Sequence, residues 1–254
     1  MADRRPGGVA EPAGPSPRCR REGGKPMTGP SAQLPLALAL RDHATLDTFE
    51  PGENALALTA LARFLERGAD RLWLWGPPGS GRSHLLQAAC HRVRASQWLP
   101  GALVLEDPEP LLAGLERMTL VALDDVHLLA GSRRAEEALF DLCNRMQAAG
   151  KALLLAASGA PLSFSWGLPD LASRLAAAGV FRLQPLDDDG RARALQRRAA
   201  VRGLSLSEPT ARYILHRIPR DPKSLFAFLD RLDAAALQSQ RRITIPFVRE
   251  ALAP

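Results

Sequence analysis

Residues 76–83, with the sequence GPPGSGRS, have the residue types and spacing that hold phosphate groups. The segment follows a short apolar run and precedes a helical pattern, and it matches the P-loop pattern G-x-x-x-x-G-K-[ST] except for arginine in place of lysine. Glycines let backbone N–H groups turn inward around phosphate, and a helix N-terminus adds positive potential. The expected nucleotide contacts are Gly76, Pro77, Pro78, Gly79, Ser80, Gly81, Arg82, Ser83 and His84.

Arg82 stands where the P-loop pattern has lysine. Its guanidinium keeps the positive charge but is longer, planar and forked, so it suits a diphosphate better than the bridge between the last two phosphates of a triphosphate. The sequence therefore predicts nucleotide binding without predicting fast hydrolysis. A Gly/Pro-rich turn between a strand and a helix, with no ligand, is the alternative interpretation.

Two consecutive carboxylates, Asp124 and Asp125, end the apolar run that starts at residue 120. In P-loop proteins the first acid holds Mg²⁺ and the next acidic residue polarises the attacking water. Ser83 and Asp124 are thus the expected Mg²⁺ residues, and Asp125, one methylene shorter than glutamate, is at most a vestigial base. Capping of the following helix is the alternative role for this acidic pair.

Apolar runs alternate with helical patterns over residues 47–186 and predict an α/β fold, a five-stranded parallel sheet flanked by helices. The five expected strands are residues 71–75, 101–106, 120–125, 152–158 and 180–186. Helices are expected over residues 47–68, from Gly81 to about Arg94, and between the later strands. From residue 187 onward successive helical patterns predict a small all-helical domain, residues 187–254.

The composition points to an ordinary globular chain with a disordered N-terminal segment. With 254 residues and 46% hydrophobic residues the chain can bury a substantial core, and its three cysteines show no metal-binding or disulfide spacing. The net charge of +6 is split between the first 26 residues and the rest, which weakens a nucleic-acid interpretation. Residues 1–32 are expected to be disordered, and no apolar run is long enough for a signal or a membrane span. A cytoplasmic location is expected.

Together these motifs resemble the DnaA branch of the AAA+ ATPases, and within it the Hda family, the regulatory inactivators of DnaA. The resemblance extends over residues 33–252 and rests on the segments QLPLAL, GRSHLL, GLPDLASRL, LQPL and TIPFVREAL. It implies that residues 41–186 form an AAA+ nucleotide-binding domain and that residues 187–254 form its helical lid. The family's own P-loop tolerates arginine, so Arg82 agrees with the assignment.

The resemblance also implies roles for individual residues. Arg174 matches the arginine finger that is offered to a neighbour's nucleotide, and Arg220 matches the lid's sensor arginine. Ser158 follows the fourth strand where the branch has a small polar residue, but glycine replaces the aspartate that usually comes next. Together with Arg82 and Asp125, this departure implies weak intrinsic turnover and bound ADP, or ATP, with Mg²⁺.

The segment QLPLAL, residues 33–38, resembles the short peptide that docks on the DNA polymerase III sliding clamp. Gln33 would provide the polar contact, and Leu34, Leu36 and Leu38 the apolar anchors, within a motif at residues 33–40. An N-terminal edge strand is the alternative, although a proline at position 35 disfavours an internal strand. The chain stops after the lid, so sequence-specific DNA binding is not expected.

The expected function is therefore inactivation of DnaA, with this chain acting as an adaptor that is tethered to the clamp. The partners would be DnaA, the clamp on DNA, and a second copy of the chain in a homodimer. Hydrolysis would take place at DnaA's nucleotide and be stimulated in trans. Two alternatives stay open at this point: a self-sufficient ATPase of the helicase-loader type, and a DnaA-like scaffold without nucleotide, which the intact glycines and Ser83 argue against.

Overall fold

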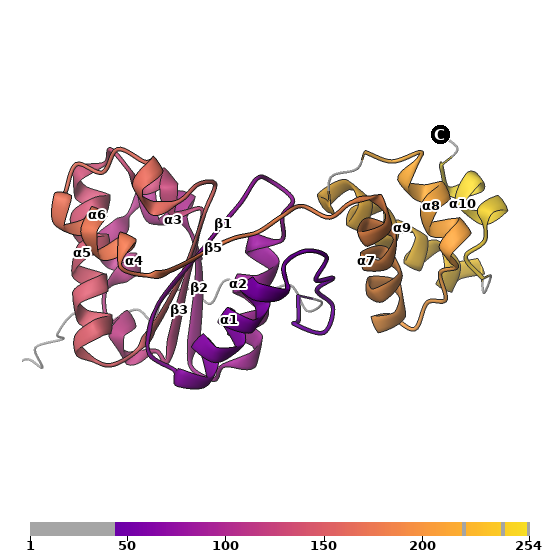
Figure 1. Cartoon of the computed structure of the whole chain (residues 1–254). Helices are drawn as coiled ribbons and strands as arrows, with labels where there is room; N and C mark the ends of the chain where they lie inside the picture. The colour runs from indigo at the N-terminus through magenta and orange to yellow at the C-terminus, as the bar shows by residue number, and fades with distance from the viewer. Residues whose placement is uncertain (1–43, 220–221, 240–241, 253–254) are drawn as a thin grey trace, which may run out of the picture. The chain divides into compact units, whose positions relative to one another are not determined.

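The computed structural model describes residues 44–219, 222–239 and 242–252. The predicted clamp-binding residues Gln33, Leu34, Leu36 and Leu38, and the predicted sensor Arg220, lie outside these residues. Two portions of the chain are each built around their own core: an α/β domain that ends near residue 186, and a helical domain, residues 188–252 (Figure 1).

The α/β domain contains the predicted five-stranded parallel sheet, in the order β2-β3-β4-β1-β5. The strands are β1 (Asp70–Trp75), β2 (Ser96–Pro100), β3 (Leu120–Asp124), β4 (Ala152–Ala157) and β5 (Gly179–Arg182). β3 and β4 are buried along their whole length, as expected for central strands of a sheet covered on both faces. Because the strands are parallel, their carboxyl ends meet at one edge, where the loops after β1 and β3 carry GPPGSGRS and the acidic pair.

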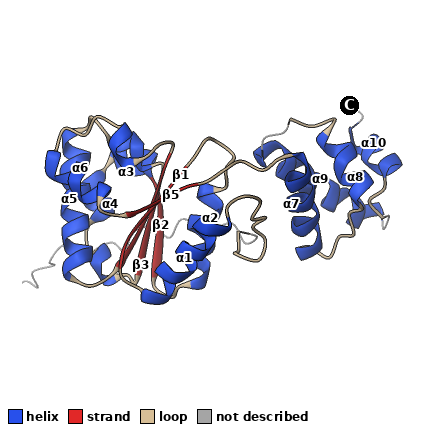
Figure 2. Cartoon of the chain, in the orientation of Figure 1, coloured by secondary structure: helices blue, strands red, loops and turns tan. Residues whose placement is uncertain are grey.

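Helices cover both faces of this sheet (Figure 2). One face packs against α1 (Ala55–Arg67) and α2 (Arg82–Arg92), and the other against α4 (Pro108–Leu112), α5 (Arg133–Ala148) and α6 (Pro169–Ala176). The alternation of β1 divides its side chains between the faces: Leu72 and Leu74 join the first core and Trp73 the second. Each fully buried leucine contributes about 1.5–3 kcal/mol, so these two layers stabilise the edge of the sheet that carries GPPGSGRS.

One predicted strand is wrong. Residues 101–106 form the helix α3 (Gly101–Glu106), and the strand that precedes it, β2, lies at residues 96–100. Short apolar runs do not distinguish a buried strand from a buried helix, and here Gly101 and Val104, three residues apart, are the buried positions. Packing also requires glycine at position 101, because a Cβ there would lie 2.5 Å from the Asp125 carbonyl oxygen.

Other predicted elements were confirmed in type but are shorter. The helix expected from residue 47 begins at residue 55, after the turn-rich segment PGEN. The helix expected between the second and third strands is broken into α4 and a 3₁₀ turn, Leu115–Arg117, by Gly114 with φ of 73°. The last strand ends at residue 182 rather than 186.

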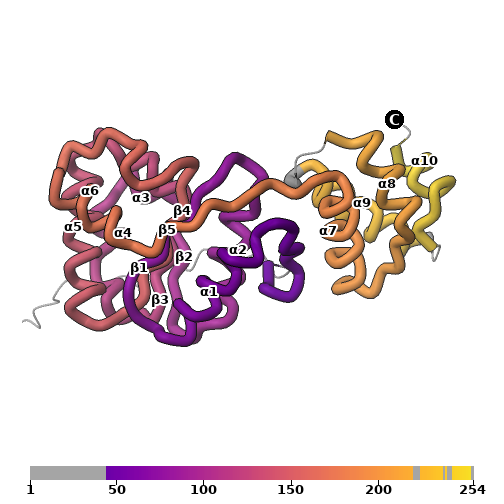
Figure 3. The backbone as a smooth tube through the Cα atoms, in the orientation of Figure 1, coloured from indigo at the N-terminus to yellow at the C-terminus, as the bar shows by residue number. Residues whose placement is uncertain are grey.

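The helical domain consists of α7 (Asp188–Val201), α8 (Glu208–Leu215), α9 (Pro222–Ser239) and α10 (Ile245–Leu252) (Figure 3). Asp187 caps α7 by accepting a 2.7 Å hydrogen bond from the Gly190 N–H, and Ser207 caps α8 through the Thr210 N–H. The four helices enclose a core that includes Leu195, Ile214, Leu229 and Val248. No helix within the described residues is long and apolar enough to cross a membrane.

Candidate nucleotide-binding site

The loop between β1 and α2 folds as a phosphate cradle. Gly79 and Gly81 have φ of 81° and 95°, a backbone region open mainly to glycine. Gly76 closes on the sheet, since its N–H donates to the Ala157 carbonyl at 3.3 Å and a Cβ there would collide with the Leu183 carbonyl. The loop thus requires glycine for its conformation and points the start of α2 toward the cavity beside it.

That cavity has a volume of about 360 Å³. It is lined by residues 48–50 and 78–84, and by Ala194, Arg198 and Phe226 of the helical domain. Two polar atoms at its phosphate-loop side, Ser80 Oγ and Arg82 Nη1, are buried and have no hydrogen-bond partner within the described residues. Unpaired buried donors beside a cavity suit an anionic ligand, so the residues present fit a nucleotide's phosphates.

Arg82 is engaged by the second acid of the pair. Its Nη2 lies 3.1 Å from Asp125 Oδ1, and the side chains are 11% and 43% exposed respectively. Asp125 has φ of 47°, a left-handed conformation that aspartate tolerates better than most non-glycine residues. One terminal nitrogen of Arg82 is therefore held by Asp125 and the other is left for a ligand.

Asp124 is buried at the end of β3. Burial raises the pKa of its carboxyl, an effect opposed mainly by a hydrogen bond from the Ser83 hydroxyl. Asp124 Oδ1 also accepts the Asp125 N–H at 3.0 Å. Within the described residues no group of three or more His, Cys, Asp or Glu side chains could hold a metal unaided. Ser83 and Asp124 together could instead hold the Mg²⁺ that a nucleotide brings with it.

His127 lies beside the acidic pair. Its Nδ1 is 4.0 Å from Asp125 Oδ1, and its ring stacks on Phe164 with centroids 5.5 Å apart. Burial lowers the pKa of this imidazole, and the charge of Asp125 only partly opposes the shift. A neutral ring at neutral pH follows, so His127 adds little positive charge to the site.

His84 joins the phosphate loop to the segment before α1. Its Nε2 lies 2.8 Å from the Thr45 carbonyl oxygen and 3.3 Å from Thr48 Oγ1, and its ring meets Phe49 edge-on. Phe49 in turn lies on the loop, because a Cβ on Gly81 would be 2.5 Å from its Cε2. His84, predicted as a nucleotide contact, thus lines the cavity and also anchors its wall.

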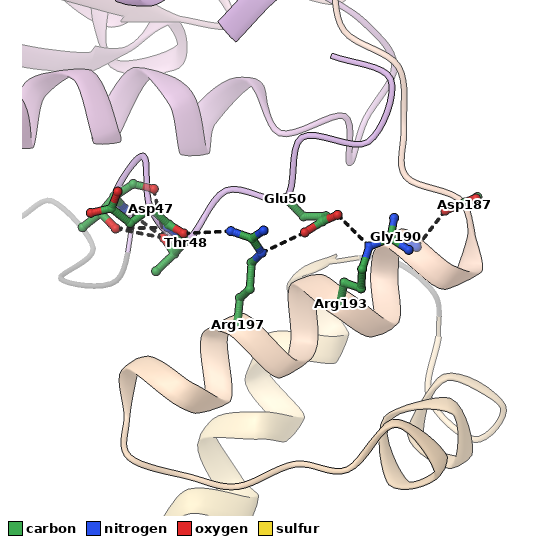
Figure 4. Close-up of polar contacts among 8 residues, drawn as sticks. Asp47, Thr48, Glu50, Asp187, Gly190, Arg193 and Arg197 are labelled. Atoms are coloured by element: carbon green, nitrogen blue, oxygen red, sulfur yellow. Dashed lines mark hydrogen bonds and ion pairs between the residues drawn. The ribbon is translucent and has the colours of Figure 1, made fainter. Parts of the chain in front are cut away.

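Residues that the motifs did not indicate connect this wall to the helical domain (Figure 4). Glu50, whose side chain is 6% exposed, accepts a hydrogen bond from Arg193 Nε at 2.8 Å and forms an ion pair with Arg197, whose Nε lies 2.9 Å from Oε2. Arg197 also donates to the Asp47 carbonyl at 3.4 Å. Both arginines come from α7, so a single buried carboxylate holds the first helix of the lid.

Two further cavity residues of the helical domain were also missed. Arg198 is 6% exposed, and its guanidinium carbon lies 4.0 Å from the centroid of the Phe226 ring. A stacked cation and aromatic ring offer a nucleotide both a positive charge and a flat apolar surface. Neither residue stands in a recognisable motif, and only the packing of α7 against α9 brings them together.

Arg174 lies on α6 and is not among the residues that line the cavity. Its Nη1 donates to Gln147 Oε1 at 2.8 Å, and its guanidinium lies 5.2 Å from the centre of the Phe140 ring. Ser158 is exposed after β4 and is not a cavity residue either. The structure therefore brings together the phosphate loop and the acidic pair, and keeps Arg174 and Ser158 apart from the cavity.

Comparison with known families places this geometry. Residues 188–252 match the model of the Hda lid domain. The chain is also similar to domain III of the Thermotoga maritima replication initiation protein DnaA, with a TM-score of 0.70 and 20% identity over 85% of this chain and 98% of that one. Residues 188–252 are thus an Hda-type lid, and the chain as a whole shares the fold of DnaA domain III.

Two further solved structures show how widely this AAA+ fold is shared. AMPPCP-bound DnaA from Aquifex aeolicus has a TM-score of 0.62 and 21% identity, covering 80% of this chain and 69% of that chain. A RuvB variant from Thermotoga maritima has a TM-score of 0.58 and 21% identity, covering 80% and 68%. The predicted fold, an AAA+ α/β domain followed by a helical lid, is thus confirmed.

Proposed function

We propose that this AAA+ protein binds an adenine nucleotide and regulates DnaA by stimulating hydrolysis of the ATP bound to DnaA. The observation that carries the proposal is an Hda-type lid on a DnaA-like fold whose phosphate loop borders a cavity of about 360 Å³. The AMPPCP held by one structural neighbour supports an adenine nucleotide as the ligand.

Within the nucleotide site, the backbone of residues 76–83 would cradle the phosphates, with Arg82 as the cation. Ser83 and Asp124 would hold the Mg²⁺ that neutralises phosphate charge. Asp125 forms an ion pair with Arg82, which draws its carboxylate away from the role of a base and supports weak intrinsic turnover. ADP is accordingly the proposed resident nucleotide, and the nucleotide serves to fix the lid.

Arg174 would act on DnaA's nucleotide. A guanidinium that reaches the transferring phosphoryl group stabilises the charge that develops there and accelerates hydrolysis by orders of magnitude. Its placement away from the chain's own cavity supports action in trans. The product, DnaA with ADP, would be inactive for initiation, and re-initiation of replication would be prevented.

The clamp would localise this activity. QLPLAL, residues 33–38, is the proposed docking peptide for the polymerase III sliding clamp on DNA, which would place the protein in the cytoplasm near the nucleoid. A homodimer is a further proposed assembly. The proposed division of the chain is residues 1–32 as an N-terminal extension, 33–40 as the docking motif, 41–186 as the AAA+ domain and 187–254 as the lid.

The test is hydrolysis of radiolabelled ATP preloaded on DnaA, measured with and without clamp loaded on DNA. The intact protein is expected to accelerate hydrolysis only with the clamp present, and the double variant Gln33→Ala/Leu34→Ala to lose that effect. If DnaA's ATP persists while this protein consumes its own ATP, the regulatory proposal fails and an ATPase of the helicase-loader type replaces it.

A further inference from the structure

Two arginines share one neutral acceptor on the face of the sheet that carries α5 and α6. Arg71 Nη1 and Arg174 Nη1 both donate to Gln147 Oε1, at 3.1 and 2.8 Å. They come from distant parts of the chain, the start of β1 and the end of α6, and Gln147 lies in the last turn of α5. A side-chain amide thus holds two guanidinium groups side by side.

The two guanidinium groups are held by an amide rather than by a carboxylate. Within the described residues neither Arg71 nor Arg174 forms an ion pair, and Arg71 Nε is buried without a hydrogen-bond partner. The carboxylate of Asp70 accepts only the Arg71 backbone N–H. The positive charge also acts on Cys143, where both arginines oppose the effect of burial that raises the pKa of the thiol to about 11.

The space beside the pair is open. A pocket of about 260 Å³ lies beside Arg71 and Gln147. Lys151 and Asp70 also line it, whereas Arg174 is not among its lining residues. The buried Nε–H of Arg71 has no hydrogen-bond partner within the described residues, and Lys151 adds a cation on the same pocket, so this wall fits an anion brought from outside.

We propose that Arg71 and Arg174 form a paired-arginine anion site, assembled on Gln147, that engages the terminal phosphate of the nucleotide on a DnaA partner. This inference rests on the proposed function, in which Arg174 is the arginine finger, and it adds two residues to that element. Gln147 is a positioning residue, and Arg71 is a second cation for the same anion. Two forked guanidiniums can grip a phosphate from two sides, which a single arginine cannot do.

The neutrality of Gln147 is essential to this site. An amide oxygen orients the guanidiniums without consuming their charge, whereas a carboxylate at the same place would form a charge-assisted pair with both and compete with phosphate. Glutamate at position 147 should therefore lower the stimulated hydrolysis rather than raise it. A loss of activity in Gln147→Glu distinguishes an anion site from a hydrogen bond that is only structural.

The experiment measures stimulated hydrolysis of DnaA-bound ATP by the full chain with clamp and DNA. One arginine finger alone is worth orders of magnitude in rate, so we expect Arg71→Ala, which removes one of the two arginines, to lower the stimulated rate about tenfold. Gln147→Glu should lower the rate at least as much. Gln147→Ala should lower it less. Affinity for DnaA carrying ATP or ADP is the second readout. The intact chain should prefer the ATP form, and Arg71→Ala should lose that preference.

Arg133→Ala is the matched control, because Arg133 is a surface arginine on α5, the helix that carries Gln147, but it pairs with Glu137. Thermal melting of each variant verifies that it folds. Full stimulation by folded Arg71→Ala and Gln147→Glu, with Arg174→Ala inactive, overturns the paired site and leaves the proposed function standing. Full stimulation by Arg174→Ala overturns the proposed function and the paired site together.

Discussion

Arg82 Nη2 lies 3.1 Å from Asp125 Oδ1, so the cation of the phosphate loop is already shared with a carboxylate. A triphosphate carries more negative charge than a diphosphate and suffers more from this neighbour. Asp125→Asn should therefore strengthen MgATP binding about fivefold and MgADP binding less, the size expected for a partly exposed ion pair. Calorimetric titration of both nucleotides measures the difference.

Asp170→Asn is the control for that substitution, because Asp170 is an exposed carboxylate on α6 outside the cavity. It should leave both affinities unchanged. Equal strengthening of ATP and ADP by Asp125→Asn would show that the pair does not discriminate between them.

The buried carboxyl of Asp124 gives a pH-dependent prediction. Burial raises its pKa above the unfolded value, so the folded chain binds more protons, and stability falls as pH rises from about 4 through the raised pKa. Asp124→Asn should raise the Tm of the nucleotide-free protein at pH 7, by about 2–4 °C for each kcal/mol relieved, and less at pH 4. The same variant should lose the Mg²⁺ dependence of nucleotide binding. A lower Tm at pH 7 would contradict this prediction.

Gly81 is constrained by both backbone and packing. With φ of 95°, and with Phe49 Cε2 2.5 Å from any Cβ, Gly81→Ala should cost about 2 kcal/mol or more in the free energy of unfolding. Urea denaturation measures that loss. Gly68→Ala, at φ of 65° with no atom within 4 Å of a Cβ, should cost only about 1 kcal/mol. Adding Phe49→Leu should recover part of the Gly81→Ala loss, and no recovery would argue against the Phe49 contact.

Glu50 couples the cavity wall to α7 through Arg193 and Arg197. Glu50→Gln should speed amide hydrogen exchange in α7 and weaken ADP binding by about three- to tenfold, because the residue also lines the cavity. A double-mutant cycle with Arg197→Gln should show coupling. The control is Asp188→Asn, whose ion pair with Arg191 lies within α7 itself. Strictly additive effects of Glu50→Gln and Arg197→Gln would show that the bridge does not hold α7.

Local patterns predicted what local sequence determines. The phosphate loop, the acidic pair and the capped helices of the lid depend on fixed short spacings, and the structure has them in place. Residues 101–106 were misassigned because a six-residue apolar run satisfies either periodicity, and the close approach of Gly101 to the Asp125 carbonyl is visible only in the structure.

The local sequence carries no pattern that predicts contacts between residues far apart in the chain. Glu50 and Arg193 are 143 positions apart, and Arg71 and Gln147 are 76 apart. Each charge taken alone resembles an ordinary solvated surface residue, and only the fold shows that Glu50 is buried and that Gln147 serves two arginines. The Arg82–Asp125 contact could have been anticipated, since β1 and β3 present both residues at the same edge of the sheet.

The most direct test of the account is the rate of hydrolysis of ATP preloaded on DnaA, with clamp on DNA, for the intact protein against Arg174→Ala. Arg133→Ala serves as the matched surface arginine. We predict that Arg174→Ala lowers the stimulated rate of hydrolysis at least a hundredfold. The variant should still bind ADP, because Arg174 lies outside the chain's own cavity. Undiminished stimulation by a folded, ADP-binding Arg174→Ala protein would contradict the account.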